Sequence, residues 1–279
     1  GNSGAINLGV TGGTSPYTYA WTGGATTQDI TAGAGTYTVT VTDAHNCTAT
    51  ITRTITQPAP LAFTDSVTNV TCNGAANGAI STSVTGGTTP YTYTWSNGSS
   101  SSSITGLSGN TYTLTIQDAN TCSVTGSFTV AEPAALTSSI TKTDVTCHGA
   151  ANGSASVTVG GGTTPYTYLW SNFQATPSVS GLSGGTYFVI ITDAHGCTKR
   201  DTAVIAEPAA IAIADTVLNV GCNGNSGAIN IGVTGGTSPY TYAWTGGATT
   251  QDITAGAGTY TVTVTDAHNC TATITRTIT

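Results

Sequence analysis

The chain has 279 residues, a net charge of −7 and charged side chains at only 6% of positions. Five Lys and Arg residues cannot hold a phosphate backbone or an anionic membrane surface, so the composition argues against nucleic-acid partners and membrane binding. No apolar run is long enough for a membrane-spanning helix. Thr, Val, Ile and Tyr alternate and are punctuated by Gly, Asn and Pro, which predicts an all-β chain.

One ten-residue motif, of the form Gly-Gly-Thr-Thr-Pro-Tyr-Thr-Tyr-Thr-Trp, occurs four times with small changes. It lies at residues 12–21, 86–95, 161–170 and 235–244. Aligning the copies divides the chain into modules 1 to 4, at residues 1–60, 61–135, 136–210 and 211–279. Proline-bearing hinges at 57–60, 132–135 and 207–210 end each of the first three modules.

Modules 1 and 4 are nearly the same sequence. Residues 1–56 repeat residues 224–279 with one difference, Leu8 against Ile231. Module 1 begins without the opening strand expected in the others, and module 4 ends before its hinge. We therefore expect the chain to be a window on a longer array whose larger repeating unit is three modules.

Module 2 shows the expected strands most clearly from its period-2 alternation of apolar residues. They are 61–71, 79–85, 91–96, 102–107, 111–117 and 124–131. Short strands with regular turn signals predict small immunoglobulin-like β-sandwich modules in tandem. A β-solenoid or propeller is disfavoured, because the period is long for one coil or blade and four copies would make a small propeller.

Two tyrosines and a tryptophan alternate along the third strand of each module, so they project to one face. We predict that they form the core. They are Tyr17, Tyr19, Trp21, Tyr91, Tyr93, Trp95, Tyr166, Tyr168, Trp170, Tyr240, Tyr242 and Trp244. A Gly-x-Thr-Tyr approach to the fifth strand, ending at Tyr112 in module 2, is typical of a tyrosine corner, whose hydroxyl bonds to nearby backbone.

Three stretches of module 2 resemble the SprB repeat: Cys-Asn-Gly-Ala-Ala-Asn-Gly at 72–78, the aromatic motif with its extension at 86–98, and Gly-Asn-Thr-Tyr through Cys at 109–122. The likeness recurs four times and covers essentially the whole chain. SprB repeats occur in tandem in very large surface adhesins of gliding Bacteroidota and in other secreted proteins of that phylum. The resemblance implies type IX secretion and a location on the cell surface, attached to the outer membrane or as an extracellular filament.

Seven cysteines follow the repeat. Cys72, Cys147 and Cys222 follow the first strand, and Cys47, Cys122, Cys197 and Cys270 lie in the turn before the last strand. Their regular use in a secreted repeat predicts disulfides. Metal binding is disfavoured because no Cys-x-x-Cys spacing occurs and His148 stands alone beside Cys147.

The pairing of these cysteines has two alternatives. Bridges within modules would be 72–122, 147–197 and 222–270, leaving Cys47 single. If the modules have standard immunoglobulin topology, the two turns lie at opposite ends of a module, beyond the ~7 Å that a disulfide allows between Cα atoms. Stacked modules would then be joined by 72–197 and 147–270, the alternative that this topology favours.

An aspartate begins the turn before the last strand in every module, at Asp43, Asp118, Asp193 and Asp266. We expect each to cap its turn. The alternative cofactor is Ca²⁺, but calcium sites gather several carboxylates and each turn offers one. His45, His195 and His268 occupy the same turn, with Asn120 in module 2, and no nucleophile motif accompanies them. We expect no enzyme activity.

Three further features are open to modification or binding. Ser66, Thr202 and Thr216 each follow Asp and precede an apolar residue, the O-glycosylation pattern of the same phylum. Threonine ladders such as 36–42 suggest ice binding, but the proline hinges would interrupt a flat array and Thr is a common strand residue. Phe173 replaces glycine in a turn of module 3 and is expected to be exposed.

From these features we expect a non-enzymatic, secreted shaft of a surface adhesin or filament, acting in attachment or gliding. Its expected partners are polysaccharides or glycoconjugates of a cell surface or substratum, reached through the array or a separate tip domain, together with neighbouring repeats or copies of itself. The alternative is a fibre that self-assembles by lateral packing or strand exchange, with module 1 as the acceptor. A carbohydrate-binding or ice-binding array ranks below both.

Overall fold

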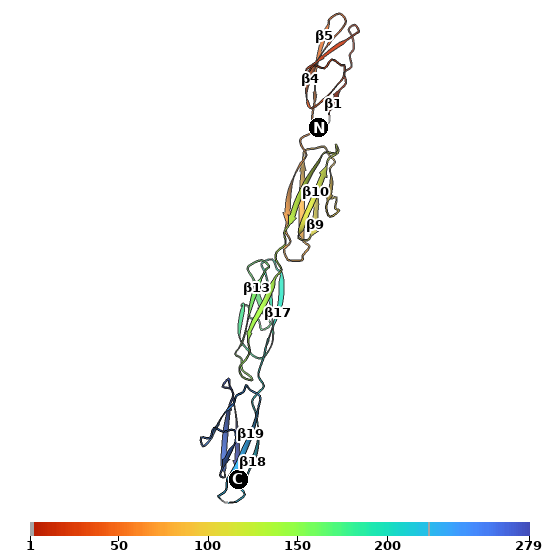
Figure 1. Cartoon of the computed structure of the whole chain (residues 1–279). Coiled ribbons are helices and arrows are strands. Elements are labelled where there is room, and N and C mark those ends of the chain that lie inside the picture. The colour runs from red at the N-terminus through yellow and green to blue at the C-terminus, as the bar shows by residue number, and fades with distance from the viewer. Residues whose placement is uncertain (1–2, 223) are drawn as a thin grey trace. The chain divides into compact units, whose positions relative to one another are not determined.

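The computed structural model describes residues 3–222 and 224–279, and all their regular secondary structure is β-strand (Figure 1). No helix in these residues could cross a bilayer. The chain forms two compact units. The first comprises the chain up to Thr68, Ala79–Thr105 and Thr111–Thr129, and the second comprises Asn69–Gly78, Gly106–Asn110 and Val130–Thr279.

Module 1 contains β1 (Gly4–Ile6), β2 (Thr18–Trp21), β3 (Ile30–Ala32), β4 (Gly35–Thr42) and β5 (Thr48–Ile55). Module 2 contains β6 (Ala62–Thr68), β7 (Gly78–Thr85), β8 (Thr92–Trp95), β9 (Ser103–Leu107), β10 (Asn110–Gln117) and β11 (Ser123–Val130). These are the six strands that the alternation predicts, with ends that agree within three residues.

Module 3 contains β12 (Thr137–Thr143), β13 (Gly153–Gly160), β14 (Thr167–Trp170), β15 (Ser178–Leu182), β16 (Gly185–Thr192) and β17 (Thr198–Ile205). Module 4 contains β18 (Ala212–Leu218), β19 (Gly227–Thr234), β20 (Thr241–Trp244), β21 (Ile253–Ala255), β22 (Gly258–Thr265) and β23 (Thr271–Ile278). The strand pattern of module 2 thus recurs in both.

Each of these three modules has two antiparallel three-stranded sheets. In module 3 the sheets are β12-β13-β15 and β14-β16-β17, and modules 2 and 4 repeat this order. The first, second and fourth strands thus form one sheet, while the third, fifth and sixth form the other. This is the strand partition of an immunoglobulin-like sandwich, so the predicted fold class is confirmed.

The core of each module lies between its two sheets, around the motif tryptophan. In module 3, Trp170 is 1% exposed and packs with Val189, Ile191 and Ile205, each 2% exposed or less. The strands alternate: in β10 of module 2, Tyr112, Leu114 and Ile116 are buried, whereas the threonines between them are exposed. The small core is therefore built from every second residue.

The hinges are hydrogen-bonded to the module that follows them. The backbone N–H of Gly162 donates to the Ala134 carbonyl at 2.8 Å, and Gly236 donates to Ala209 at 2.8 Å. At the preceding glycine, Gly235, φ is +74° and a Cβ would overlap the Ala210 carbonyl oxygen. The paired glycines of the motif are needed because the hinge backbone occupies the space of a side chain.

Candidate functional surfaces

The predicted core aromatics divide into two groups. Trp21, Trp95, Trp170 and Trp244 are 5% exposed or less. All eight tyrosines of the set are half-buried, and Tyr166 and Tyr168 of module 3 pack against the buried core of that module. The hydroxyl explains the difference, because it must keep a polar partner. In module 3 Tyr166 donates from Oη to the Gly161 carbonyl at 2.6 Å.

The tyrosine corner is present at the fifth strand. Tyr187 donates from Oη to the Ser183 carbonyl at 3.2 Å, and Tyr260 donates to the Gly256 carbonyl at 3.1 Å. In module 1, Tyr37 makes the same bond to Gly33 at 3.0 Å, and modules 1 and 4 share an approach sequence that differs from that of module 3. The bond depends on the backbone of the turn, so it tolerates that change in side chains.

The turn aspartates join two turns of the same module. In module 3, Asp193 Oδ1 accepts the backbone N–H groups of His195 and Cys197, and Oδ2 accepts that of Thr163, each at 2.9 Å. Burial raises the pKa of Asp193, but these backbone donors outweigh it, so the pKa lies below its usual value. Backbone donors already engage both oxygens, which favours a structural role for this carboxylate.

The other three turn aspartates make the same bonds. His45, His195 and His268 contribute their backbone N–H to this arrangement, and their side chains are exposed. Among the described residues, no three His, Cys, Asp or Glu side chains gather as a metal site would require. The histidines therefore act through the backbone in these contacts.

Two disulfides join consecutive modules within the second compact unit. Cys72 bonds Cys197, with 5.7 Å between their Cα atoms, and Cys147 bonds Cys270, with 5.6 Å. Each bridge links the loop after the first strand of one module to the turn before the last strand of the next. This is the between-module pairing, and it corrects the within-module alternative of 72–122, 147–197 and 222–270. Cys47, Cys122 and Cys222 are unpaired and exposed.

Module 1 differs from module 4 although their shared residues are nearly identical. In module 4, β18 pairs with β19, and its Ile211 and Ile213 pack against the core. In the described part of module 1, β1 pairs only with β3, and a groove of about 470 Å³ is lined by Leu8, Val10 and Val41 among others. Module 1 therefore presents an open edge beside a partly exposed core.

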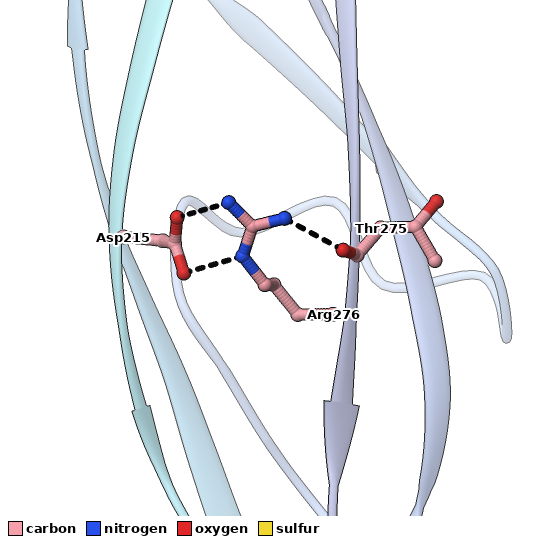
Figure 2. A network of polar contacts seen from close by, with 3 residues as sticks. All are labelled: Asp215, Thr275 and Arg276. Carbon is pink, nitrogen blue, oxygen red and sulfur yellow. Dashed lines mark hydrogen bonds and ion pairs between the residues drawn. The ribbon is translucent and has the colours of Figure 1, made fainter.

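Asp215 of β18 anchors the first strand of module 4 to the last (Figure 2). It accepts two hydrogen bonds of 2.7 Å from Nε and Nη2 of Arg276, and Arg276 Nη1 bonds the Thr275 carbonyl. The hydrogen bonds from Arg276 lower the pKa of Asp215. Arg53 is the matching residue of module 1. Its side chain is exposed, and among the described residues the guanidinium donates only to the Thr52 carbonyl.

The three candidate glycosylation residues, Ser66, Thr202 and Thr216, all lie on strands with exposed side chains. Phe173 is 89% exposed, as expected from its place in the turn. Sequence reasoning missed two further exposed apolar residues of module 3, Leu169 and Val204, at 50% and 56%. Their signal was present, because both stand where the other modules have Thr or Ala.

The paired sheets define a tandem array of immunoglobulin-like modules. The family model of the SprB repeat matches residues 1–26, 64–100, 139–175 and 214–249, one match in each module, and the chain belongs to that family. No curated protein matches the chain. SprB repeats and two disulfides together indicate an extracellular or surface repeat protein.

Several solved structures resemble the chain at low identity. The N-terminal eight Ig domains of Down Syndrome Cell Adhesion Molecule isoform 1.30.30 match 100% of this chain and 58% of their own, at 11% identity and a TM-score of 0.29. The S-layer protein rSbsC(31-844) matches 94% of this chain and 50% of its own length, at 14% identity and a TM-score of 0.27. A chain in the complex of Dpr2 Ig1-Ig2 with DIP-Theta Ig1-Ig3 matches 78% of this chain and 98% of its own length, at 11% identity and a TM-score of 0.30. Scores this low carry no functional argument.

Proposed function

We propose that this chain is a non-enzymatic shaft of a cell-surface adhesin or extracellular filament, used in surface attachment or gliding. One observation carries the proposal: each bridge in the second unit joins one module to the next. A bridge inside a module stabilises a single bead, whereas a bridge between modules resists their separation. Such reinforcement suits a molecule that bears load along its length.

The chemistry of the described surface is consistent with a mechanical role. The turn aspartates are engaged by backbone donors, the motif tryptophans are buried, and no metal cluster is present among the described residues. Attachment would come from many weak contacts summed along the array, or from a tip domain. Partners of the polysaccharide or glycoconjugate class suit this mode.

Small-angle scattering and bead attachment test the shaft. The oxidised chain should scatter as an elongated particle, and beads coated with it should hold to a polysaccharide-coated surface under flow. Alkylated, reduced chain should hold at lower shear, because its modules can separate. A compact particle, or attachment that is no better than albumin-coated beads, would contradict the proposal.

A fibre built by strand addition is a second function that we propose; it would use β1 of module 1, which among the described residues pairs only with β3. Exchange of β18 between two copies of these 279 residues would close module 1 of one copy and open module 4 of the other, so the pair would gain little strand pairing. A free segment with the sequence of residues 211–219 would gain the full pairing, with its aspartate facing Arg53. Titration of that peptide into the chain, with an Arg53→Ala control, tests this. Ordered filaments in electron micrographs would favour the fibre, and isolated threads the shaft.

A further inference from the structure

The outward face of the second sheet is a threonine lattice in three of the four modules. In module 1, Thr38 and Thr52 lie opposite each other with 2.9 Å between their hydroxyl oxygens. In module 4, Thr261 and Thr275 repeat this at 2.9 Å. Module 2 has Thr111 beside Thr129, with 3.2 Å between their oxygens. These faces are uncharged, hydroxylated and alike.

Module 3 replaces this lattice at five positions. Leu169 of β14 lies opposite Ile190 of β16, and Ile190 lies opposite Arg200 of β17. Two residues along β16, Phe188 lies opposite Thr202, and two further on Thr186 lies opposite Val204. Alternation places all of them on the face away from buried Val189 and Ile191. Leu169, Phe173, Phe188, Ile190, Arg200 and Val204 are called the module 3 face below.

The module 3 face exposes apolar surface where the other modules do not. Leu169, Phe173 and Val204 are three of the four large apolar side chains that are exposed among the described residues. Phe173 is 89% exposed and has φ +67°, a conformation that disfavours any residue except glycine. The corresponding residues are Gly24, Gly98 and Gly247, with φ of 83–90°. An exposed aromatic at a strained position gains nothing for folding, which points to a binding role.

The face also carries one positive charge. The guanidinium carbon of Arg200 lies 4.1 Å from the centroid of the Phe188 ring. No described carboxylate pairs with Arg200, and the outward positions of β14, β16 and β17 contain none. The chain as a whole is acidic, with a net charge of −7. The face thus combines the Phe188 ring, the Arg200 guanidinium that lies over it, and the hydroxyls of Thr186 and Thr202.

We propose that the module 3 face binds an acidic polysaccharide, one with carboxylate or sulfate groups along its chain. Sugar rings stack on Phe188 and Phe173, the threonine hydroxyls bond sugar hydroxyls, and Arg200 pairs with the acid group. A second copy of the chain fits less well, because an identical face offers no carboxylate to Arg200. The inference deepens the proposed function by locating the contact on module 3, and it rests on that function because the shaft is what presents this face to a surface.

The test uses the full, oxidised chain made without glycosylation, since a glycan on Thr202 would cover the face. Affinity electrophoresis in gels with alginate, a polyuronate, is compared with gels containing neutral dextran. We expect retardation by alginate alone. Arg200→Thr or Phe188→Thr should weaken alginate binding about fivefold, and raised salt should weaken it further. Phe173→Gly, which keeps the turn, should weaken it as well.

A charge-matched variant separates the site from net charge. Arg200→Thr combined with Thr50→Arg moves the cation to the equivalent position of module 1, which has Thr38 in place of Phe188. Its net charge equals that of the unaltered chain, yet it should bind like Arg200→Thr alone. Equal binding by all variants, recovery in the matched variant, or equal retardation by dextran would overturn the proposal. So would self-association that Phe188→Thr abolishes.

Failure here is distinguishable from failure of the shaft. Beads that attach under flow as well with Arg200→Thr as with the unaltered chain would remove the site and leave the shaft. A compact oxidised chain that fails to attach would remove the shaft, whatever alginate does. All substitutions are at outward positions, and near-ultraviolet circular dichroism with a thermal scan confirms that each variant is folded.

Discussion

The two disulfides divide the covalent chain in an unusual way that a force experiment can measure. Cys72 with Cys197 forms one junction, and Cys147 with Cys270 forms another. Three segments run in parallel between the junctions: residues 72–147, 147–197 and 197–270. When the modules are unfolded by pulling on the two ends of the chain, the shortest of the three segments becomes taut. Its extended length then sets the distance between the two junctions.

The expected lengths follow from about 3.5 Å per extended residue. The taut segment, 147–197, spans about 175 Å. Cys72→Ser removes one junction, and the load then passes through residues 72–147, which adds about 90 Å. Removing the second bridge as well, with Cys147→Ser, frees the whole stretch and adds about 430 Å more. Removal of the first bridge should therefore lengthen the unfolded chain about five times less than removal of the second.

Optical tweezers with handles at both termini, at forces that unfold the modules, measure these lengths in alkylated protein. Cys122→Ser is the control, because Cys122 is unpaired and its removal should change nothing. Bridges within modules would give a different result: each removal, including Cys122→Ser, would add about 175 Å. Equal increments of that kind would refute the between-module connectivity and the reasoning built on it.

Three further predictions concern stability. Phe173→Gly should stabilise module 3 by about 1 kcal/mol, a rise of a few degrees in its melting temperature by calorimetry, because it relieves the φ of +67°; a fall would show that the ring packs on something. Gly235→Ala should destabilise by about 3 kcal/mol through overlap with the Ala210 carbonyl, whereas Gly12→Ala, with open space around it, should lose about 1 kcal/mol; equal losses would contradict the role of the hinge contact. Asp266 has a pKa below its usual 3.8, because the backbone donors Thr237, Cys270 and His268 outweigh burial, so its contribution is complete above that value and is lost as pH falls through the lowered pKa. The urea midpoints at pH 7 and pH 3 should lie closer together in Asp266→Asn than in the unaltered chain, and an unchanged difference between them would count against this bond.

The strands were predictable from sequence because their signal is local. Alternation and turn residues recur in every module, and the fold needs little beyond them. The depth of the tyrosines was not predictable in this way, because period 2 assigns a face but not an exposure. Tyr166 lies on the expected side, yet its hydroxyl holds it near the surface at the Gly161 carbonyl.

Long-range features needed the structure. The spacing of the cysteines alone allows Cys72 to pair with Cys122 or Cys197; the expected immunoglobulin topology favoured Cys197, and the positions of the turns in the structure confirm that pairing. The module 3 face was visible as five departures from the threonine or alanine of the other modules, but those departures gain meaning only from the register that places them together. Phe173 stood out by itself because it replaces a glycine in an aligned turn.

The parallel segments between the two junctions also affect how the chain withstands proteolysis. A protease that cuts once anywhere between Cys72 and Cys270 leaves both ends of the chain covalently joined through the remaining segments. Two cuts in different segments still leave one intact route. A shaft exposed to extracellular proteases would thus lose a module's folding before it lost its continuity, and damage would soften the molecule without releasing its far end.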